Sequence, residues 1–269
     1  MTADTYELYY WPTIQGRGEF VRLALEQAGV PYVDVARRPK GMAAMMKLLE
    51  GGGNDLQPFA PPFLKSGDLV IAQTATILAY LGPRHGLVPG EEMNRLRAQQ
   101  LQLTIADLVA EAHDTHHPIA GSLYYEDQKR EARRRSSVFV EERIPKYLGY
   151  LERVLDRNGG EHFVGNAVSY VDLSTFQVLA GLEYAFPNAL ARLARRIPLL
   201  RQLRDEVALQ PRIAAYLASD RRLPFNEQGI FRHYPELDRR AVGRVASAEG
   251  LPPRRRERSQ SAKRASRNT

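Results

Sequence analysis

The spacing of apolar residues differs between the beginning and the rest of this chain. In the first third, short runs with high strand propensity alternate with apolar stripes at helical spacing. Residues 6–11 are rich in aromatic side chains and predict a strand, which Pro12 ends because proline has no N–H to donate to a sheet. Residues 20–28 predict a helix, closed by Gly29 and Pro31 in the order typical of a helix C-terminus. The chain therefore opens with a strand and a helix.

The segment that follows predicts three more strands and another helix. The strands are expected at residues 32–35, 63–65 and 69–72, the last two joined by a tight turn at Ser66, Gly67 and Asp68. Between Arg37 and Phe59 the pattern weakens to a surface loop with one short helix at residues 42–49. A helix at residues 75–81 ends at Gly82 and Pro83. The predicted order is βαβ, a gap, then ββα.

After residue 91 the pattern is helical almost throughout. Helices are expected at residues 96–112, 128–156, 170–183, 190–194 and 199–208. Ser169 and Asp172 fit a capping box, in which the hydroxyl and the carboxylate satisfy free amides at a helix start. The change from mixed to helical patterning near Pro89 and Gly90 predicts a domain boundary. We expect an α/β domain over residues 1–83 and an all-helical domain over residues 91–234.

Composition narrows the class of protein. With 269 residues, 43% of them apolar, the chain can bury a substantial core. It has no apolar run of the ~20 residues needed to cross a bilayer, and its first ten residues lack the pattern of a signal peptide, so we expect a soluble cytoplasmic protein. There is no cysteine, which excludes disulfides, thiolate-bound zinc and cysteine nucleophiles. Any sulfur chemistry must use a sulfur atom of a ligand.

The positive charge is concentrated at one end of the chain. The net charge is +7, but residues 239–269 hold ten Lys or Arg against two Glu, so the rest carries about −1. This Ser- and Ala-rich tail has too few apolar residues to offset its ordering entropy and is predicted to be disordered. Nucleic acid is not an expected partner, except through this basic tail.

Several motifs together resemble a known family. Pro62-Phe63-Leu64, the turn at residues 66–68 and Gln73-Thr74, within the order βαβ then ββα, resemble the thioredoxin-like half of cytosolic glutathione S-transferases, of the tyrosine type and similar to the sigma, mu and pi classes. Residues 165–172, Gly-Asn-Ala-Val-Ser-Tyr-Val-Asp, resemble the capping motif of the helical half of that family. The resemblance covers about residues 6–218. It implies a thioredoxin-like domain that binds glutathione and an all-helical domain that binds the second substrate.

The resemblance also implies a function and a catalytic residue. Glutathione is the expected co-substrate, with no metal, in a cytoplasmic homodimer that acts in detoxification on an apolar electrophile. At neutral pH only a few per cent of a free thiol is thiolate, so a positioned hydroxyl that stabilises the anion accelerates its attack. Tyr10 matches the family's position for this donor; Tyr9 must point to the opposite face of the strand. Thr13 is the alternative donor, although a threonine there is more often a helix cap.

The expected glutathione-binding residues are Arg17, Lys47, Pro61, Pro62, Gln73 and Thr74. Gln73 and Thr74 match the family's site for the γ-glutamyl end, at a helix N-terminus where free amides favour a carboxylate. Pro62 matches the family's cis-proline, which presents backbone to the cysteinyl unit. Arg17 is the favoured partner of the glycine carboxylate, with Arg38, Lys40 and Lys47 as further contributors from the loop.

Two departures from the family pattern favour an alternative function, that of a non-catalytic protein that keeps the fold. Pro61 has no N–H, so only its carbonyl can pair with the ligand backbone, and Ala60 stands where related enzymes often carry glutamine. The segment from Tyr10 to Arg17 is also one residue longer than usual. A non-catalytic binding or scaffold protein that keeps the fold is therefore the second hypothesis.

Three histidines near the end of a predicted helix invite a metal interpretation. His113 and His117 have the i, i+4 spacing of some zinc sites, with His116 between them. No third ligand is evident from the sequence, so we expect no metal here. We assign these histidines instead to the second-substrate pocket or to a helix cap near Pro118. Further candidates for lining that pocket are Asp107, Asp114, Tyr124 and Tyr125.

Overall fold

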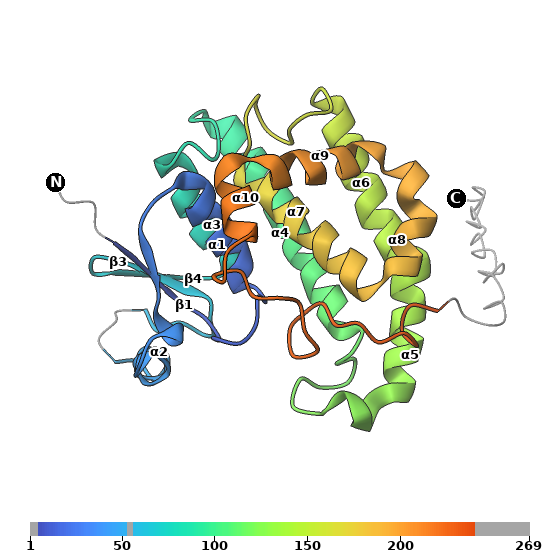
Figure 1. Cartoon of the computed structure of the whole chain (residues 1–269), viewed down its shortest axis with the longest axis horizontal. Coiled ribbons are helices and arrows are strands. Elements are labelled where there is room, and N and C mark those ends of the chain that lie inside the picture. Colours follow the sequence, from blue (N-terminus) through green and yellow to red (C-terminus); the bar gives the residue numbers. More distant parts are fainter. Residues whose placement is uncertain (1–4, 53–55, 240–269) are drawn as a thin grey trace, which may run out of the picture.

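The structure is a computed structural model and describes residues 5–52 and 56–239 (Figure 1). Its first half contains a mixed sheet of β1 (Tyr6–Tyr9), β2 (Tyr32–Asp34), β3 (Phe63–Ser66) and β4 (Leu69–Ala72). The strand order is β2-β1-β3-β4; β1 pairs parallel with β2 and antiparallel with β3, and β3 forms a hairpin with β4. The predicted order of strands and helices is confirmed, and this half is thioredoxin-like.

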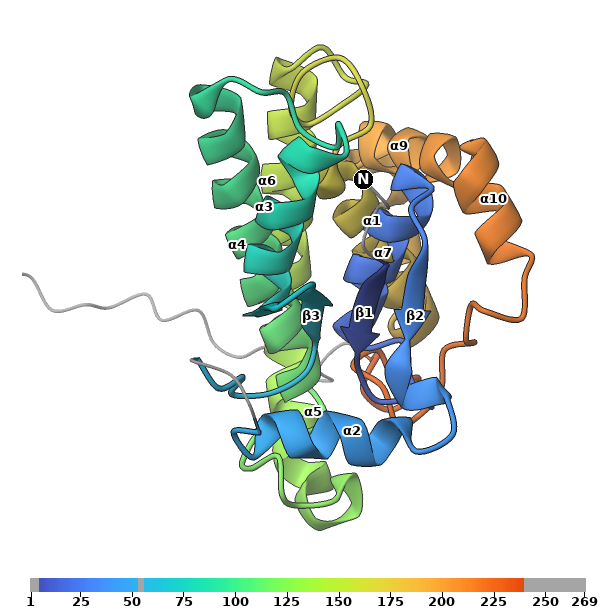
Figure 2. The same cartoon turned by 90° about the vertical axis from the view of Figure 1, so that its left-hand side faces the viewer.

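The helices of the first half are α1 (Gly18–Ala28), α2 (Gly41–Leu49) and α3 (Thr74–Arg84), with a 3-10 turn η1 at Val35–Arg37. α1 and α3 pack on the sheet through a core that includes Leu8, Leu23 and Ile77, all fully buried. Gly29 ends α1 in the left-handed conformation, as the sequence predicts. α2 lies across the lower end of the sheet in Figure 2. It is the short helix predicted within the weakly patterned segment.

The second half is helical within the described residues. Its elements are α4 (Glu92–Asp114), η2 (Tyr125–Gln128), α5 (Lys129–Val138), η3 (Phe139–Arg143), α6 (Ile144–Arg157), α7 (Tyr170–Ala185), α8 (Pro187–Leu193), η4 (Ala194–Arg196), α9 (Pro198–Leu209) and α10 (Pro211–Leu217). α7 lies at the centre and packs against α4, α9 and α1. Because α7 contacts α1, the helical half is joined directly to the thioredoxin-like half.

The capping box at the start of α7 is confirmed. The backbone N–H and the hydroxyl of Ser169 both donate to Asp172 at 2.6 Å, and the N–H of Asp172 donates back to the hydroxyl at 3.4 Å. The N–H of Phe163 donates to the second carboxylate oxygen at 2.9 Å. The box therefore also fixes the loop that leads into α7.

Some predicted boundaries were wrong, for local reasons. The single helix expected over residues 128–156 is interrupted by a π-helical turn at Phe139–Arg143. α3 continues through Pro83 to Arg84, because a proline in the last turn removes only one backbone hydrogen bond. β1 ends at Tyr9, two residues before the expected end. α10 was missed, since it has only seven residues and buries only Ile213 and Tyr216.

After α10, residues 219–239 form an irregular segment, here called the strap, which runs along the helical half (Figure 1). Phe231 packs directly on Gly181 of α7, and Tyr234 stacks on Tyr125 at 4.0 Å between ring centroids. The carboxylate of Asp238 accepts the first free amides of α8. The predicted disordered tail lies outside the described residues from residue 240 onward. None of the described helices is both long enough and apolar enough for a membrane span.

Candidate active site

Tyr10 is the first residue after β1, and its side chain is 4% exposed. Tyr9 points to the other face of the sheet, where its ring stacks on Phe63 with centroids 4.7 Å apart. The Tyr9 hydroxyl donates to Glu7 at 2.5 Å. Because its proton is committed to a carboxylate and its ring to the core, Tyr9 has a packing role. Tyr10 is the tyrosine that faces the loop before α1.

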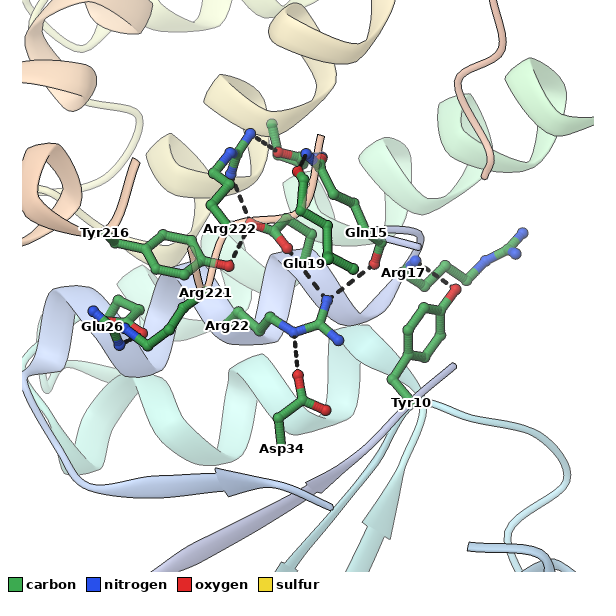
Figure 3. Close-up of polar contacts among 12 residues, drawn as sticks. Tyr10, Gln15, Arg17, Glu19, Arg22, Glu26, Asp34, Tyr216, Arg221 and Arg222 are labelled. Carbon is green, nitrogen blue, oxygen red and sulfur yellow. Dashed lines mark hydrogen bonds and ion pairs between the residues drawn. The ribbon is translucent and has the colours of Figure 1, made fainter. Parts of the chain in front are cut away.

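That loop, residues 11–17, encloses the Tyr10 side chain. The backbone N–H of Arg17 donates to the Tyr10 hydroxyl oxygen at 2.8 Å (Figure 3). Gly16 and Gly18 lie against the ring so closely that a Cβ on either would come within 2.1 and 2.6 Å of its atoms. In the part of the chain that the structure describes, no group accepts the hydroxyl's own proton. That proton is free to be donated to a ligand.

The environment keeps Tyr10 in the neutral form. Burial raises the pKa of its phenol, and this effect outweighs the Arg17 N–H and the charges of Arg17 and Arg22, which lower it. A phenol with a raised pKa stays protonated at neutral pH and acts as a hydrogen-bond donor. The Arg17 N–H polarises the same O–H group and strengthens it as a donor.

Thr13, the alternative donor, is exposed in the middle of the loop. Its carbonyl accepts from the side chain of Asn226 at 3.0 Å. α1 begins only at Gly18, so Thr13 does not cap that helix. The capping role considered for it is therefore wrong.

Gln73 and Thr74 stand at the start of α3, where β4 ends. Gln73 has φ 68° and ψ 119°, a conformation that costs a residue with a side chain about 1–3 kcal/mol. Its side chain makes no capping hydrogen bond. The hydroxyl of Thr74 is buried and has no partner among the described residues; it lies beside a cavity of about 30 Å³ that Arg17 and Gln102 also line. Strain and an unused hydroxyl at one helix N-terminus are typical of a ligand site.

Pro62 is buried at the start of β3, and the bond between Pro61 and Pro62 is cis. The cis-proline expected from the family resemblance is confirmed. Pro61 is half-buried and Ala60 exposed. The backbone at this point offers the Pro61 carbonyl as an acceptor and no N–H.

The two basic residues expected to bind glutathione differ in position. Arg17 immediately precedes α1, and in Figure 3 its guanidinium extends away from the other labelled charges. Within residues 5–52 and 56–239 no carboxylate pairs with it. Lys47 is exposed in the last turn of α2, and its ammonium likewise has no partner among the described residues. The backbone of Arg17 contacts the Tyr10 hydroxyl, whereas Lys47 lies on α2, a separate surface helix.

The three histidines pack together at the C-terminal end of α4, with ring centroids 4.8–5.1 Å apart. His116 is buried, and its Nε2 donates to the carbonyl of Ile230 at 2.8 Å. Burial, with the charge of Arg232, lowers its pKa to about 2; burial lowers that of His113 to about 4, with a contribution from Arg17. Among the described residues, no three His, Cys, Asp or Glu side chains are arranged to hold a metal ion.

A buried charge network behind Tyr10 was missed in the sequence. Arg22 is fully buried in α1, donates to Asp34 at 2.7 Å and to Glu19 at 3.2 Å, and lies 5.8 Å from the Tyr10 ring centroid (Figure 3). Glu19, also fully buried, accepts from Arg222 at 2.6 Å and from Tyr216 at 2.9 Å. The available signal was two charged residues on the apolar stripe predicted for residues 20–28 and its N-terminal edge.

Comparisons with known proteins agree with this geometry. Residues 113–220 match the family model of the glutathione S-transferase C-terminal domain. A glutathione S-transferase of Plasmodium falciparum is 26% identical over 224 residues, which cover 81% of this chain and 97% of the relative. Glutathione S-transferase 1 of Ascaris suum is 29% identical over 227 residues, which cover 82% and 98%.

Solved structures share the fold. The pi-class glutathione S-transferase of Onchocerca volvulus superposes with a TM-score of 0.65 at 21% identity, covering 84% of this chain and 99% of that one. The enzyme of Ascaris lumbricoides gives a TM-score of 0.62 at 25% identity, covering 82% and 100%. The similarity to glutathione S-transferases therefore extends over both the thioredoxin-like and the helical half of this chain.

Proposed function

We propose that this protein is a tyrosine-type glutathione transferase in which Tyr10 stabilises the thiolate of glutathione for attack on an apolar electrophile. The observation that carries the proposal is the Tyr10 hydroxyl: its oxygen accepts the Arg17 N–H at 2.8 Å, and its own proton has no acceptor in the described structure. Such a hydroxyl donates a hydrogen bond to a sulfur placed beside it. The similarity to glutathione S-transferases supplies glutathione as the source of that sulfur.

The main chemical contribution of the protein is the hydrogen bond that Tyr10 donates to the sulfur of glutathione. Glutathione loses its thiol proton to solvent, and the resulting thiolate accepts a hydrogen bond from Tyr10 rather than a full proton, because burial raises the phenol's pKa. Each unit by which the thiol pKa falls corresponds to ~1.4 kcal/mol of stabilisation of the anion. A sulfur lone pair then forms the bond to carbon, and the leaving group departs with the electron pair of the bond that breaks.

The remaining site residues hold the two ends of the tripeptide. The γ-glutamyl carboxylate lies at the N-terminus of α3, where Gln73 and Thr74 supply free amides and an unpartnered hydroxyl. The glycine carboxylate pairs with Arg17, with Lys47 as a more distant contributor. The Pro61 carbonyl accepts the N–H of the cysteinyl unit, the one backbone bond that Pro61-Pro62 can provide.

This division of work follows the predicted domains. Residues 1–83 bind glutathione, and residues 91–234 supply most of the pocket for the electrophile, near His113 and the strap. The protein acts in the cytoplasm as a homodimer. Support for the dimer comes from α4, where Met93, Leu96 and Leu103 are all at least half exposed on one face. An apolar face of this kind is stabilised when a second copy covers it.

The test compares two single-oxygen variants. Tyr10→Phe should bind glutathione about as well as the wild type in calorimetry but lose about 10²-fold in turnover of an aryl halide, the usual effect of removing one donor to a developing anion. Thr13→Val should leave both unchanged. Wild-type turnover in Tyr10→Phe, or failure of the wild type to bind millimolar glutathione, would contradict the proposal.

A further inference from the structure

The loop that encloses Tyr10 is held from outside by the helical half and the strap. The side chain of Gln15 is 5% exposed and donates to the carbonyl of Leu223 in the strap. The carbonyl of Thr13 accepts from Asn226, also in the strap. Two points of the loop thus depend on residues about 210 positions later in the chain.

A third contact of the loop reaches α7, the central helix. Nε2 of Gln177 donates to Oε1 of Gln15 at 2.7 Å, and both side chains are buried. Oε1 of Gln177 in turn accepts from Arg222 at 3.1 Å. The buried amide of Gln177 is therefore hydrogen-bonded at both ends, through its nitrogen to the loop and through its oxygen to the strap.

The same arginine connects this amide to the charge network under the loop. Arg222 also donates to Glu19, and Glu19 accepts from Arg22. Arg22 returns to the loop by donating to the Gln15 carbonyl at 3.3 Å. Gln15 is thus fixed by its side chain and by its backbone. Figure 3 shows Gln15, Glu19, Arg22 and Arg222 grouped on one side of Tyr10.

Gln15 is two residues before Arg17, whose N–H reaches the Tyr10 oxygen. Gly16, between them, has φ 48° and lies against the Tyr10 hydroxyl, so the backbone here has little freedom to absorb a shift of Gln15. A displacement of Gln15 therefore moves the Arg17 N–H away from Tyr10.

We propose that Gln177 is a positioning residue for Tyr10: by holding Gln15, it keeps the Arg17 N–H on the phenol oxygen and so makes Tyr10 a stronger donor to sulfur. The inference rests on the proposed function, because it concerns the donor that stabilises the thiolate. It gives the helical half a role in activating glutathione, in addition to binding the second substrate.

The variant Gln177→Glu isolates the contact. Glutamate has the same shape and keeps an acceptor for Arg222, but it has no proton for Gln15. Thr175→Val is the control. Thr175 is on the same helix and fully buried, and its hydroxyl has no partner in the part of the chain that the structure describes, so the substitution removes no hydrogen bond to the loop. Gln177→Leu, which adds no buried charge, is the second variant if Gln177→Glu does not fold.

Two measurements follow the loop and the thiolate separately. In the free protein, amide exchange of peptides containing Arg17 should be about tenfold faster in Gln177→Glu, the factor for one lost hydrogen bond. With glutathione bound, the pH midpoint of thiolate absorbance should rise by about 0.5–1 unit. Thr175→Val should match the wild type in both. A glutamine that merely stabilises the fold would lower the melting temperature and leave the midpoint unchanged.

The outcomes separate this inference from the proposed function. If the wild type forms a thiolate that Tyr10→Phe abolishes, but both Gln177 variants keep the wild-type midpoint, the positioning role is wrong and the function stands. If the wild type forms no thiolate at all, the proposed function fails and the inference fails with it. A raised midpoint in Gln177→Glu or Gln177→Leu, with an unchanged midpoint in Thr175→Val, supports the positioning role.

Discussion

A Cβ atom on Gly16 would lie 2.1 Å from the hydroxyl oxygen of Tyr10. The φ of Gly16, 48°, is also in the left-handed region that favours glycine. Steric and conformational constraints therefore coincide at the residue that separates Gln15 from Arg17. The position of the Tyr10 hydroxyl depends on the absence of a side chain at this point.

Gly16→Ala should consequently displace the Tyr10 hydroxyl or the Arg17 N–H, since both cannot keep their places beside a methyl group. We predict at least about a tenfold loss of turnover, a smaller effect than removal of the hydroxyl because the donor is displaced and not deleted. Steady-state kinetics on an aryl halide provides the measurement. Gly121→Ala is the control, because a Cβ there meets nothing within 4 Å. Equal turnover in both variants would contradict the described packing.

Arg17→Leu should weaken glutathione binding. A charge-assisted hydrogen bond to a carboxylate is worth about 1.5–3 kcal/mol, so the dissociation constant should rise about tenfold or more. Calorimetry checks this, with Arg95→Leu as the control, an exposed arginine on α4. The loss should also shrink at high salt, because the interaction is partly exposed. An unchanged dissociation constant would remove Arg17 from the glutathione site.

His116 should make the fold sensitive to acid. Its pKa falls from the ordinary 6.5 to about 2 on folding, because burial disfavours the charged form and Arg232, His113 and His117 surround it with positive or titratable groups. Below pH 6.5 His116 binds a proton in the unfolded chain but not in the folded chain. The free energy of unfolding therefore falls as the pH falls, by up to ~1.4 kcal/mol per pH unit for this residue.

The variant that tests this is His116→Gln, which keeps a donor for the Ile230 carbonyl but does not titrate. Urea unfolding between pH 6.5 and 4 should show a shallower loss of stability in the variant than in the wild type. Parallel curves for the two proteins would mean that His116 is protonated equally in the folded and unfolded states.

Leu96→Glu should disrupt the proposed homodimer, because it places a charge in the exposed apolar face of α4. Light scattering after size exclusion should show a monomer for the variant and a dimer for the wild type. Leu209→Glu is the control: Leu209 is 77% exposed, but on α9. A dimer that survives Leu96→Glu, or a monomeric wild type, would place the interface elsewhere or exclude it.

The sequence predicted the fold where signals are local. The strands, α1, the hairpin and the capping box of Ser169 and Asp172 depend on spacing, propensity and residues within three or four positions. The π-helical turn at Phe139–Arg143 was not predicted, since its residues continue a helical pattern and tertiary packing alone sets the change. The strap was not predicted either, because it lacks periodicity and is fixed by contacts such as Phe231 on Gly181.

The residues of the candidate site likewise divide into those that local sequence motifs predicted and those that only the fold brings together. Tyr10, Gln73 and Pro62 follow from motifs, and the structure gives each a distinctive geometry. Tyr10 has a buried hydroxyl whose proton has no acceptor among the described residues, Gln73 has a strained backbone, and Pro62 follows a cis bond. Their roles in binding and catalysis stay predictions. The pair of Gln15 and Gln177 is 162 positions apart in the chain, and neither glutamine carries a motif. Only the fold brings them together.

The most direct test of the central claim is the pH dependence of the absorbance of glutathione thiolate bound to the wild type and to Tyr10→Phe. We predict a midpoint in the wild type at least about one pH unit below that in the variant, with similar affinity for glutathione in both. Identical midpoints in two proteins that both bind glutathione would contradict the role of Tyr10 as the thiolate donor.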